Sequence, residues 1–522
     1  MKNIAVIDSE TDPFEYGVFV KPFIWGFFDE TGFTHFDSTE KLLWFLKDKE
    51  YIVYCHNGGK FDFHFMLEYI NKYQEVTVIH GRLAKFTIGL CEFRDSYCIL
   101  PTPLKEFKKD DFDYSILKEN ERRKPENRKK ILKYLENDCK YLYEYVTGFI
   151  EKYGINLTLA GSAFNQWKVL QNINSVPRTT SQFYNRIKPY YFGGRCECFY
   201  KGLINKKFIM IDINSAYPYA MLFEHPYTID GEYYLSENLP TKNIEQTFIC
   251  LVCKSTGAFP FRETDKSTAF PNDGKERTFY ITGWEFITAK ELGLLKRYKI
   301  KSVIRFYDTI NFKKYVNHFY KLKQNTPKDQ KEYIYYKLFL NSLYGKFGAN
   351  PENYKTYEFI DSDVLPEMLK DGYTESGIFE NTACVSKPLE ENKQFYRSIP
   401  VSASITGFVR AYLLRALHTV KNPMYCDTDS IVCTDKGKLS INKELGGWSL
   451  DGSFLSGGIA GKKLYAFRKE NGEYKTASKG VKATAQEILR IVKGEIITFK
   501  KESPVFSLKY GQKFIDKNIK KT

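Results

Sequence analysis

Two carboxylates stand two residues apart in the segment MYCDTDSIVC, which covers residues 424–433. The neighbours of Asp427 and Asp429 in this segment are apolar or small, and none of them is basic. Unpaired carboxylates beside a core are unfavourable unless a cation compensates them, so the segment predicts a metal-binding turn in a hairpin with buried arms. An Asp-rich surface turn is the alternative when the segment is taken alone.

Two further segments fit a site for a nucleoside triphosphate beside that turn. Asp212 follows the apolar run of KFIMIDINSAYPYAM, in which a Tyr-Pro pair starting at Tyr217 turns the chain. In KLFLNSLYGKFG, Lys337, Asn341 and Tyr344 are four and three residues apart, which predicts that they share one helix face. Such a face offers an ammonium group to a triphosphate and an aromatic ring to a base. Taken singly, an exposed lysine and a packed tyrosine explain the same residues.

A second set of carboxylates comes from the N-terminal part. Asp8 and Glu10 in AVIDSET are two apart on a predicted strand and therefore leave the same face. Asp62 follows in CHNGGKFDFHFML, and Tyr134 and Asp138 in KYLENDCKYL are four apart on a predicted helix. The four carboxylates can hold two divalent ions about 4 Å apart, which would stabilise both oxygens of a phosphoryl displacement while Tyr134 orients the attacking water. A solvated acidic strand end and a core tyrosine are the alternatives.

Composition favours a polyanionic partner with stacking bases. The 522 residues indicate two or more domains, the 78 Lys and Arg exceed the 63 Asp and Glu, and 16% of the residues are aromatic. A merely solubilising charge is the alternative. The 11 cysteines do not form a zinc motif and are interpreted as reduced core residues. Because no run of about 20 apolar residues occurs, we expect a soluble, intracellular protein without a membrane partner.

The elements that position these residues fall into two parts. Strand-like NIAVIDSE and YIVYCHN, the helical STEKLLWFLKD and a long amphipathic helix up to Gly154 predict an α/β domain. Further helices are expected in SAFNQWKVLQNI, DQKEYIYYKLFLNSLYGKFG and SASITGFVRAYLLRALHTV. The stretch from Ala349 to about Tyr396 is polar and irregular, which predicts an inserted subdomain or excursion.

The order of the motifs resembles that of family B DNA polymerases, and within them the protein-primed replicative enzymes of bacteriophages with linear genomes. DSET, HNGGKFD and YLEND look like the three motifs of the family's 3′-5′ exonuclease. They are followed by YFGG at residues 191–194, DINSAYP from 212, KLFLNSLYG from 337, DTDS from 427 and KLY at 463–465. The eight motifs span nearly the whole chain.

The resemblance implies a multidomain α/β and α+β fold. An N-terminal RNase H-like 3′-5′ exonuclease domain would occupy residues 1–155, and a right-hand polymerase domain residues 156–522. The expected subdomains of the latter are the palm (about 156–224 and 398–494), a first insertion (225–320), the fingers (321–349), a second insertion (350–397) and a small thumb (495–522).

The resemblance also implies roles for individual residues. In the polymerase, Asp212 and Asp429 would bind two metal ions with Asp427 nearby, and Tyr217 would exclude a 2′-hydroxyl. The incoming nucleotide would be bound by Lys337, Asn341 and Tyr344, and the DNA by Tyr191, Gly193, Gly194, Lys463 and Tyr465. In the exonuclease, Asp8, Glu10, Asp62 and Asp138 would bind metal, with Tyr134 and Lys109 aiding the chemistry. The frayed strand would be held by Thr11, Asn57, Phe61, Ser96 and Tyr114.

The resulting hypothesis is a DNA-directed DNA polymerase with proofreading, which replicates a linear viral genome from a terminal-protein primer with strand displacement. Its expected partners are primer-template and single-stranded DNA, dNTPs and the terminal protein, with which it would form a heterodimer if it is not a monomer. Mg²⁺ is expected at two ions per site, because the predicted ligands are oxygens, and Mn²⁺ can substitute. The cytoplasm of a bacterial host is the expected location.

Three alternatives remain open at this point. A family B polymerase that uses a nucleic-acid primer or none shares the same motifs. A glycosyltransferase could use DTD to hold a metal-bound nucleotide sugar, although DSET, HNGGKFD and YLEND would then be unexplained. A non-enzymatic DNA-binding protein would explain the charge and the aromatic residues but not the carboxylate sets.

Overall fold

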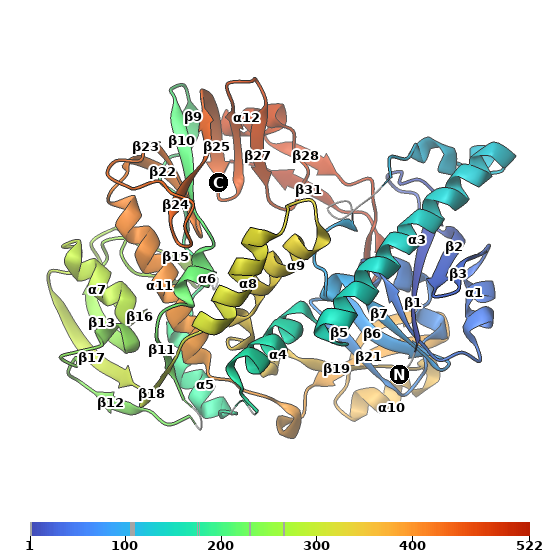
Figure 1. Cartoon of the computed structure of the whole chain (residues 1–522), viewed down its shortest axis with the longest axis horizontal. Helices are drawn as coiled ribbons and strands as arrows, with labels where there is room; N and C mark the ends of the chain where they lie inside the picture. The colour runs from blue at the N-terminus through green and yellow to red at the C-terminus, as the bar shows by residue number, and fades with distance from the viewer. Residues whose placement is uncertain are drawn as a thin grey trace.

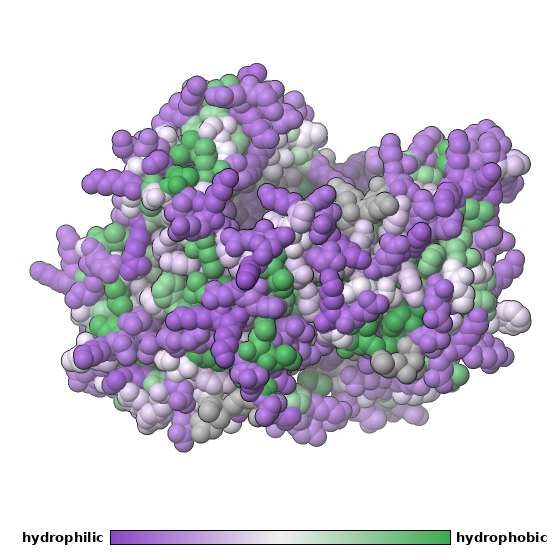
Figure 2. Space-filling view, in the orientation of Figure 1, coloured by the Kyte–Doolittle hydropathy of each residue, from purple (hydrophilic) through white to green (hydrophobic). Residues whose placement is uncertain are grey.

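The computed structural model describes residues 3–104, 110–174, 176, 178–228, 231–264 and 267–521. The N-terminal strands and the long helix that follows them form one side of the molecule, and the strands of residues 196–310 and 421–478 form the other (Figure 1). Figure 2 shows this face as mostly hydrophilic and hollowed between the two lobes at its upper edge. Within the described residues, none of the helices is long and apolar enough to cross a bilayer.

The N-terminal unit is a mixed sheet covered by one long helix. Its strands are β1 (Asn3–Thr11), β2 (Pro22–Asp29), β3 (Gly32–Phe36), β4 (Tyr51–Cys55), β5 (Glu75–Ile79), β6 (Arg82–Ile88) and β7 (Cys91–Asp95). β4 runs parallel to β1 and to β7, whereas the other pairs are antiparallel. The short helix α1 (Thr39–Leu46) is capped by the Ser38 side chain, and α2 is Glu119–Arg122.

The predicted long helix is α3 (Pro125–Tyr153), which begins with proline at its first turn and ends at Gly154 with φ 74°. Its apolar face packs on β1 and β2, and Leu135 and Cys139 contact Gly26 of β2 so closely that a side chain there would clash. The α/β domain expected from the sequence pattern is therefore present up to the end of α3.

The sheet continues into a segment far along the chain. Its ten strands follow the order β20-β21-β19-β5-β6-β7-β4-β1-β2-β3. The added strands are β19 (Lys355–Asp361), β20 (Thr374–Phe379) and β21 (Thr382–Pro388), with α10 (Leu365–Lys370) between the first two. Tyr357 and Glu358 of β19 pair with Val76 and Glu75 of β5, and Figure 1 draws β19 and β21 beside β5 and β6.

The inserted subdomain or excursion expected over residues 349–396 consists of ordered strands that join the N-terminal sheet. Charged residues such as Lys355 and Glu375 are exposed on these strands, while Phe359 and Cys384 are fully buried in the core of the N-terminal unit. An exposed polar face next to a buried apolar one is the usual pattern of a strand with only one covered side.

A second sheet and its helices form the other lobe. Its five strands are β8 (Cys196–Cys198), β10 (Phe208–Ile213), β22 (Lys421–Asp427), β23 (Ser430–Asp435) and β24 (Trp448–Phe454), in the order β24-β10-β23-β22-β8. The buried helix α11 (Ile399–Leu417) and the short α6 (Ala216–Ala220) pack in this lobe. Beside it lie β9 (Gly202–Ile204), β25 (Ser456–Gly461), β26 (Leu464–Arg468), β27 (Tyr474–Ser478) and α12 (Ala485–Val492).

A helical hairpin joins the two lobes. It consists of α8 (Lys313–Asn325) and α9 (Lys331–Ser342), and α4 (Leu159–Gln171) packs against both. Tyr335 of α9 is fully buried, donates to the carbonyl of Tyr145 at 3.1 Å and meets Phe149 of α3 edge-on. The position of the helical hairpin is therefore fixed by the C-terminal half of α3 (Figure 1).

Residues 225–310 form a separate small sheet. Its strands β12 (Tyr234–Ser236), β17 (Tyr298–Arg305), β13 (Phe248–Lys254) and β16 (Glu276–Thr282) pair in that order, and α7 (Gly283–Glu291) starts at a capping box of Thr282 and Glu285. The remaining pairs here are β11 (His225–Tyr227) with β18 (Asp308–Ile310) and β14 (Phe261–Arg262) with β15 (Thr268–Ala269). The helix α5 (Ser181–Ile187) precedes the YFGG segment.

The C-terminal residues form two strand pairs, β28 (Ile497–Lys500) with β31 (Asp516–Ile519) and β29 (Val505–Ser507) with β30 (Gly511–Lys513). The second pair, hereafter the terminal hairpin, docks on the N-terminal unit. Phe506 contacts the rings of Phe61, His64 and Phe65 at centroid distances of 5.2–5.5 Å. On the other side, a Cβ added to Gly377 of β20 would lie 1.7 Å from the carbonyl oxygen of Leu508.

The close approach at Gly377 gives a first prediction. Gly377→Ala should push the terminal hairpin away from β20 and destabilise the chain by about 1–3 kcal/mol, because the main chain of Leu508 has no room to yield. Hydrogen exchange of residues 505–513 and urea unfolding measure the two effects. Gly148→Ala, inside α3 and facing only the end of a lysine side chain, is the matched control, and an unchanged hairpin in Gly377→Ala would contradict the prediction.

Candidate active sites

The carboxylates of DTDS meet Asp212 at one end of the five-stranded sheet. Ser430 of β23 pairs with Asp212 of β10 on one side and with Asp427 of β22 on the other. The main-chain N–H of Asp429 donates to the carbonyl of Asp427 at 2.6 Å, and Thr428 between them has φ 61°. The predicted tight turn between buried strands is confirmed.

The site is electrostatically unfavourable when no cation is present. Burial, with smaller contributions from Asp429 and Asp451, raises the pKa of Asp212 to about 7. Burial also raises the pKa of Asp429 to about 6, with a contribution from Asp427. Carboxylates that disfavour one another's ionised form in this way are suited to hold a divalent cation, because its charge reverses the effect.

The expectation that no base pairs with these residues is wrong for Asp427. Lys463, which lies far from it in the sequence, forms an ion pair with its carboxylate. The hydroxyl of Tyr425 also donates to Asp427 at 3.2 Å and accepts from the main-chain N–H of Lys463 at 3.0 Å. Tyr465, buried beside Tyr425, completes this group. The KLY segment therefore lies next to DTDS. Because Lys463 is paired with Asp427, the carboxylates that remain for a cation are Asp212 and Asp429.

The residues of KLFLNSLYG reach the same region with one correction. Lys337 and Asn341 are exposed on α9, as expected, but the helix ends at Ser342, and Tyr344 lies in the following 3₁₀ turn. Its ring stacks on that of Tyr217 at a centroid distance of 4.5 Å and an angle of 11°. The two tyrosines form one flat wall near Asp429. Burial, with a smaller contribution from Asp429, raises the pKa of both phenols.

Sequence reasoning missed a lysine on the neighbouring helix. Lys323 of α8 donates to the Ser215 hydroxyl at 3.3 Å, and Ser215 lies three residues after Asp212. Burial lowers the pKa of Lys323, and the ammonium of Lys337 lowers it further, so the two amines lie close to each other. The basic, amphipathic segment KKYVNHFYKLKQN was the available signal, but nothing in it distinguishes Lys323 from its neighbours.

The YFGG segment lies against the DTDS turn. A Cβ on Gly194 would lie 2.9 Å from the side chain of Thr428, and the main-chain N–H of Thr428 donates to the carbonyl of Arg195 at 2.6 Å. The buried Arg410 of α11 donates to the carbonyls of Phe192 and Gly193 at 2.7 and 2.9 Å. An arginine in the middle of an otherwise apolar stretch of helix is a signal that sequence reasoning passed over.

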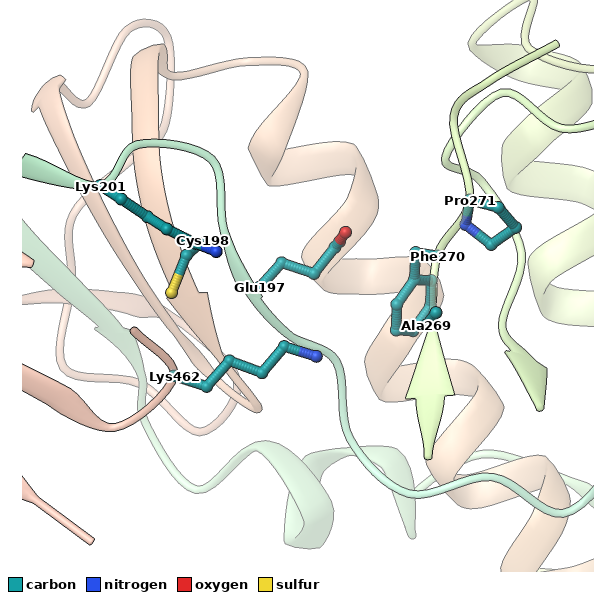
Figure 3. A pocket seen from close by; sticks show the side chains of 7 residues that line it. All are labelled: Glu197, Cys198, Lys201, Ala269, Phe270, Pro271 and Lys462. Carbon is teal, nitrogen blue, oxygen red and sulfur yellow. The ribbon is translucent and has the colours of Figure 1, made fainter. Parts of the chain in front are cut away.

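A hollow of about 450 Å³ opens beside these residues (Figure 3). Its lining includes Lys201 and Lys462 on one side and Phe270 on the other. Arg195 stacks on Phe270 at 4.3 Å and forms an ion pair with Glu197, whose side chain points toward the hollow (Figure 3). Because Lys462 precedes Lys463, the lysine-lined opening adjoins the DTDS carboxylates.

The second carboxylate set gathers at the N-terminal sheet. Glu10, Asp62 and Asp138 are buried, and Asp8 lies on the same strand as Glu10. The hydroxyl of Ser9 donates to Asp62 at 2.5 Å. Burial raises the pKa of Asp62 to about 6, which hydrogen bonds from Ser9 and Cys55 oppose. Burial raises the pKa of the Cys139 thiol, and all four predicted carboxylates raise it further, so the four lie in the neighbourhood of this thiol.

Among the described residues, one group of three or more His, Cys, Asp or Glu side chains is spaced for a cation. Ligand atoms of Asp8, Cys55 and Asp62 all lie within 4.8 Å of one another. Cys55, which sequence reasoning assigned to the core, is therefore the third member of this group. The donor set of two carboxylates and a thiol fits a divalent cation.

Tyr134 and Asp138 share the buried face of α3, as predicted. The Tyr134 ring stacks on Phe112 at 4.0 Å, and its hydroxyl is 3.2 Å from that of Tyr114, which is 52% exposed. Burial and this hydrogen bond raise the pKa of Tyr134, so it remains a neutral hydroxyl that can position water.

The residues expected to bind a frayed strand are not equally accessible. Asn57 has φ 64° and accepts from Arg82 at 2.9 Å, and Phe61 contacts Phe14 and Phe506. Thr11 is buried beside the carboxylates. Ser96 is fully buried, and its hydroxyl lies 3.0 Å from His56 Nδ1, so it orders the loop rather than lining a surface. Lys109 lies outside the described residues.

The fold and the two carboxylate sets define an enzyme that acts on phosphodiesters, and comparison with known proteins identifies its family. Residues 107–438, more than half of the chain, match the family described as DNA polymerase type B, organellar and viral. The chain belongs to this family and is a DNA-directed DNA polymerase, which confirms the resemblance and removes the glycosyltransferase and the non-enzymatic alternatives.

The relatives agree with this assignment. The DNA-directed DNA polymerase of Enterobacteria phage PRD1 is 33% identical over 99% of this chain and 98% of its own length. Phi29 DNA polymerase has the same fold, with a TM-score of 0.77 at 18% identity and complete coverage of both chains. A structure of phi29 DNA polymerase with primer-template DNA and incoming nucleotides matches with a TM-score of 0.75.

The raised pKa of Asp212 gives a prediction for the metal-free protein. A carboxyl whose pKa is raised by folding binds more protons in the folded state, so its contribution to stability falls as pH rises from about 4 to about 7. Asp212→Asn should therefore raise the melting temperature in EDTA at pH 8, by a margin that shrinks toward pH 4.

Thermal unfolding at several pH values measures this margin. Asp308→Asn, a change at an exposed carboxylate, is the control and should give no comparable pH-dependent gain. If the gain in melting temperature of Asp212→Asn grew toward low pH, this would contradict the conclusion that folding raises the pKa of Asp212.

Proposed function

We propose that this chain is a proofreading replicative polymerase that starts from a terminal protein and displaces the non-template strand. One observation carries the central part of the proposal. The chain holds two separate carboxylate sets, one at the end of each main sheet, and each lies beside tyrosine side chains. One set suits synthesis and the other suits 3′-5′ hydrolysis.

The proposed division of the chain follows its elements. The exonuclease would comprise residues 1–155, and the palm residues 156–224 and 398–494, which include β10, β22 and β23. The helical hairpin α8–α9 would belong to the fingers, residues 225–320 and 350–397 to the two insertions, and residues 495–522 to a small thumb. The end of α3 at Tyr153 and the separate small sheet of residues 225–310 support these boundaries.

In synthesis, Asp212 and Asp429 would hold divalent ions, with Mg²⁺ expected. Bound Mg²⁺ would activate the primer 3′-oxygen and stabilise the leaving pyrophosphate. Lys323, Lys337 and Asn341 would bind the triphosphate, since the two lysines lie together near Asp212. The Tyr217–Tyr344 wall would position the sugar and base, and Lys463 and Tyr465 would hold the primer end beside Asp427. Tyr191, Gly193 and Gly194 would support the template.

In proofreading, Asp8, Glu10, Asp62 and Asp138 would hold divalent ions that activate water and stabilise the leaving 3′-oxygen. Tyr134 would orient the water through its neutral hydroxyl. Phe61, Asn57, Thr11 and Tyr114 would hold the frayed strand, with Ser96 acting indirectly through His56, and Lys109 would aid the chemistry.

Protein priming is supported by the phage relatives and by the layout. The PRD1 enzyme covers almost the whole chain, and the first insertion presents a separate sheet that a protein primer could contact. The second insertion, the terminal hairpin and the N-terminal unit contact one another, which favours enclosure of DNA and strand displacement. The expected state is a monomer or a heterodimer with the terminal protein in the host cytoplasm.

A polymerase that uses a nucleic-acid primer, or none, is the alternative. The two are separated by incubating the chain with a labelled dNTP and a candidate terminal protein, followed by denaturing electrophoresis. Label bound covalently to the partner supports protein priming, and its absence in the presence of DNA-primed synthesis supports the alternative.

The two carboxylate sets should be separable by mutation. With a 5′-labelled primer on a longer template in Mg²⁺, the wild type should shorten the primer without dNTPs and extend it with them. Asp429→Asn should lose extension by about 10²-fold or more because it removes a metal ligand, and Asp8→Ala/Glu10→Ala should lose shortening alone. Shortening that persists in the double variant would contradict the exonuclease assignment.

The tyrosine wall should discriminate between sugars. Tyr217→Ala should lower the preference for dNTPs over rNTPs by about tenfold or more, since the wall would no longer exclude a 2′-hydroxyl. The ratio of kcat/KM values for the two nucleotides measures the preference. Tyr219→Phe, in the same helix, keeps the wall and should keep the ratio, and equal ratios in all three proteins would refute the role of Tyr217.

A further inference from the structure

The thiol of Cys55 lies where a cation would bind in the proposed exonuclease site. β1 and β4 run parallel with Val6 opposite Tyr54, so Asp8 and Cys55 follow at the same end of two adjacent strands. The 3₁₀ turn Asp62–Phe65 returns Asp62 to this point. The three ligand atoms, two carboxylate oxygens and one sulfur, lie within 4.8 Å of one another.

Packing holds the thiol in place. Cys55 is fully buried, and Gly58 lies so close that a Cβ there would be 2.9 Å from Cys55 Cβ and 3.0 Å from its sulfur. The close approach of Gly58 leaves the cysteine side chain little room to rotate away. The sulfur therefore stays beside Asp8 and Asp62.

We propose that this site binds thiophilic divalent cations, Cd²⁺ and Zn²⁺, through Cys55 together with one oxygen each of Asp8 and Asp62. Soft thiolate ligands select such ions, whereas Mg²⁺ takes oxygen ligands and would leave the sulfur unused. Binding would release the thiol proton to solvent and involves no change of oxidation state. The inference deepens the proposed exonuclease function, on which its biological meaning rests.

A buried core cysteine is the competing interpretation, because free cysteines commonly fill cores. Cys139 provides the matched example. It is also fully buried beside the four carboxylates, but it does not belong to the group with cation spacing. A difference between Cys55 and Cys139 in cation binding therefore separates a ligand from a packing residue.

The test is a Cd²⁺ titration of the full-length protein in excess Mg²⁺. Bound metal is measured after gel filtration, and the ultraviolet absorption of the cadmium thiolate is recorded. Cys55→Ser should abolish part of that absorption and lower the affinity of one ion by about tenfold or more, since even outer partners of metal ligands contribute about 10–100-fold. Cys139→Ser should match the wild type. The thiols other than Cys55 and Cys139 are present in all three proteins. A loss of Cd²⁺ binding that is seen only in Cys55→Ser is therefore due to Cys55.

The outcomes distinguish the two levels of the proposal. Wild-type binding and absorption in folded Cys55→Ser would overturn the cation inference. If that variant does not fold, Asp62→Asn keeps the thiol and should still lower the affinity, and unchanged affinity would overturn the inference. Primer shortening in Mg²⁺ without Cys55-dependent binding refutes the cation inference alone. Cys55-dependent binding without shortening refutes the exonuclease function and supports the cation site.

Discussion

Repulsion between carboxylates that the fold forces together is the constraint on which the polymerase lobe depends. Asp212 and Asp429 would move apart if they were on loops, because both are largely removed from water and the charge of Asp429 raises the pKa of Asp212. They are held instead by a ladder in which Ser430 pairs with strands on both sides. The free energy of that ladder and of the surrounding core keeps the site ready for a cation, at a cost in stability that is common at functional sites.

The surroundings of the turn follow from the same constraint. Thr428 can adopt its left-handed conformation because Gly194 leaves room for its side chain and Arg195 accepts its N–H. Arg410 holds the main chain of the YFGG segment by donating hydrogen bonds to two of its carbonyls, and the charge of Arg410 is balanced by the carboxylate of Glu285, 2.8 Å away. This ion pair connects α11 with α7, which packs on the small sheet of residues 234–305. The position of the turn is thus coupled to a part of the chain that contributes no carboxylate to it.

The sequence predicted which side chains come together better than it predicted the contacts that hold them in place. Residues two apart on a strand, or four apart on a helix, lie on the same face. This periodicity was enough to indicate which carboxylates point to a common site. It could not show that Lys463 pairs with Asp427, that α9 ends before Tyr344, or that Lys323 is drawn toward Ser215, since each depends on contacts between distant segments. Cys55 was missed because a thiol among apolar residues has the same pattern in a core as beside a cation.

The pairing of β19 with β5 has a consequence for the chain as a whole. Strands from residues 355–388 complete the edge of a sheet that begins at residue 3, and they share its core through Phe359 and Cys384. Removing the N-terminal unit would therefore leave β19 with a bare row of main-chain donors and acceptors and with apolar side chains in water. Such an edge recruits other chains. A shortened polymerase without its first 150 or so residues would be prone to aggregation, so the two halves of the molecule cannot be separated as independent modules.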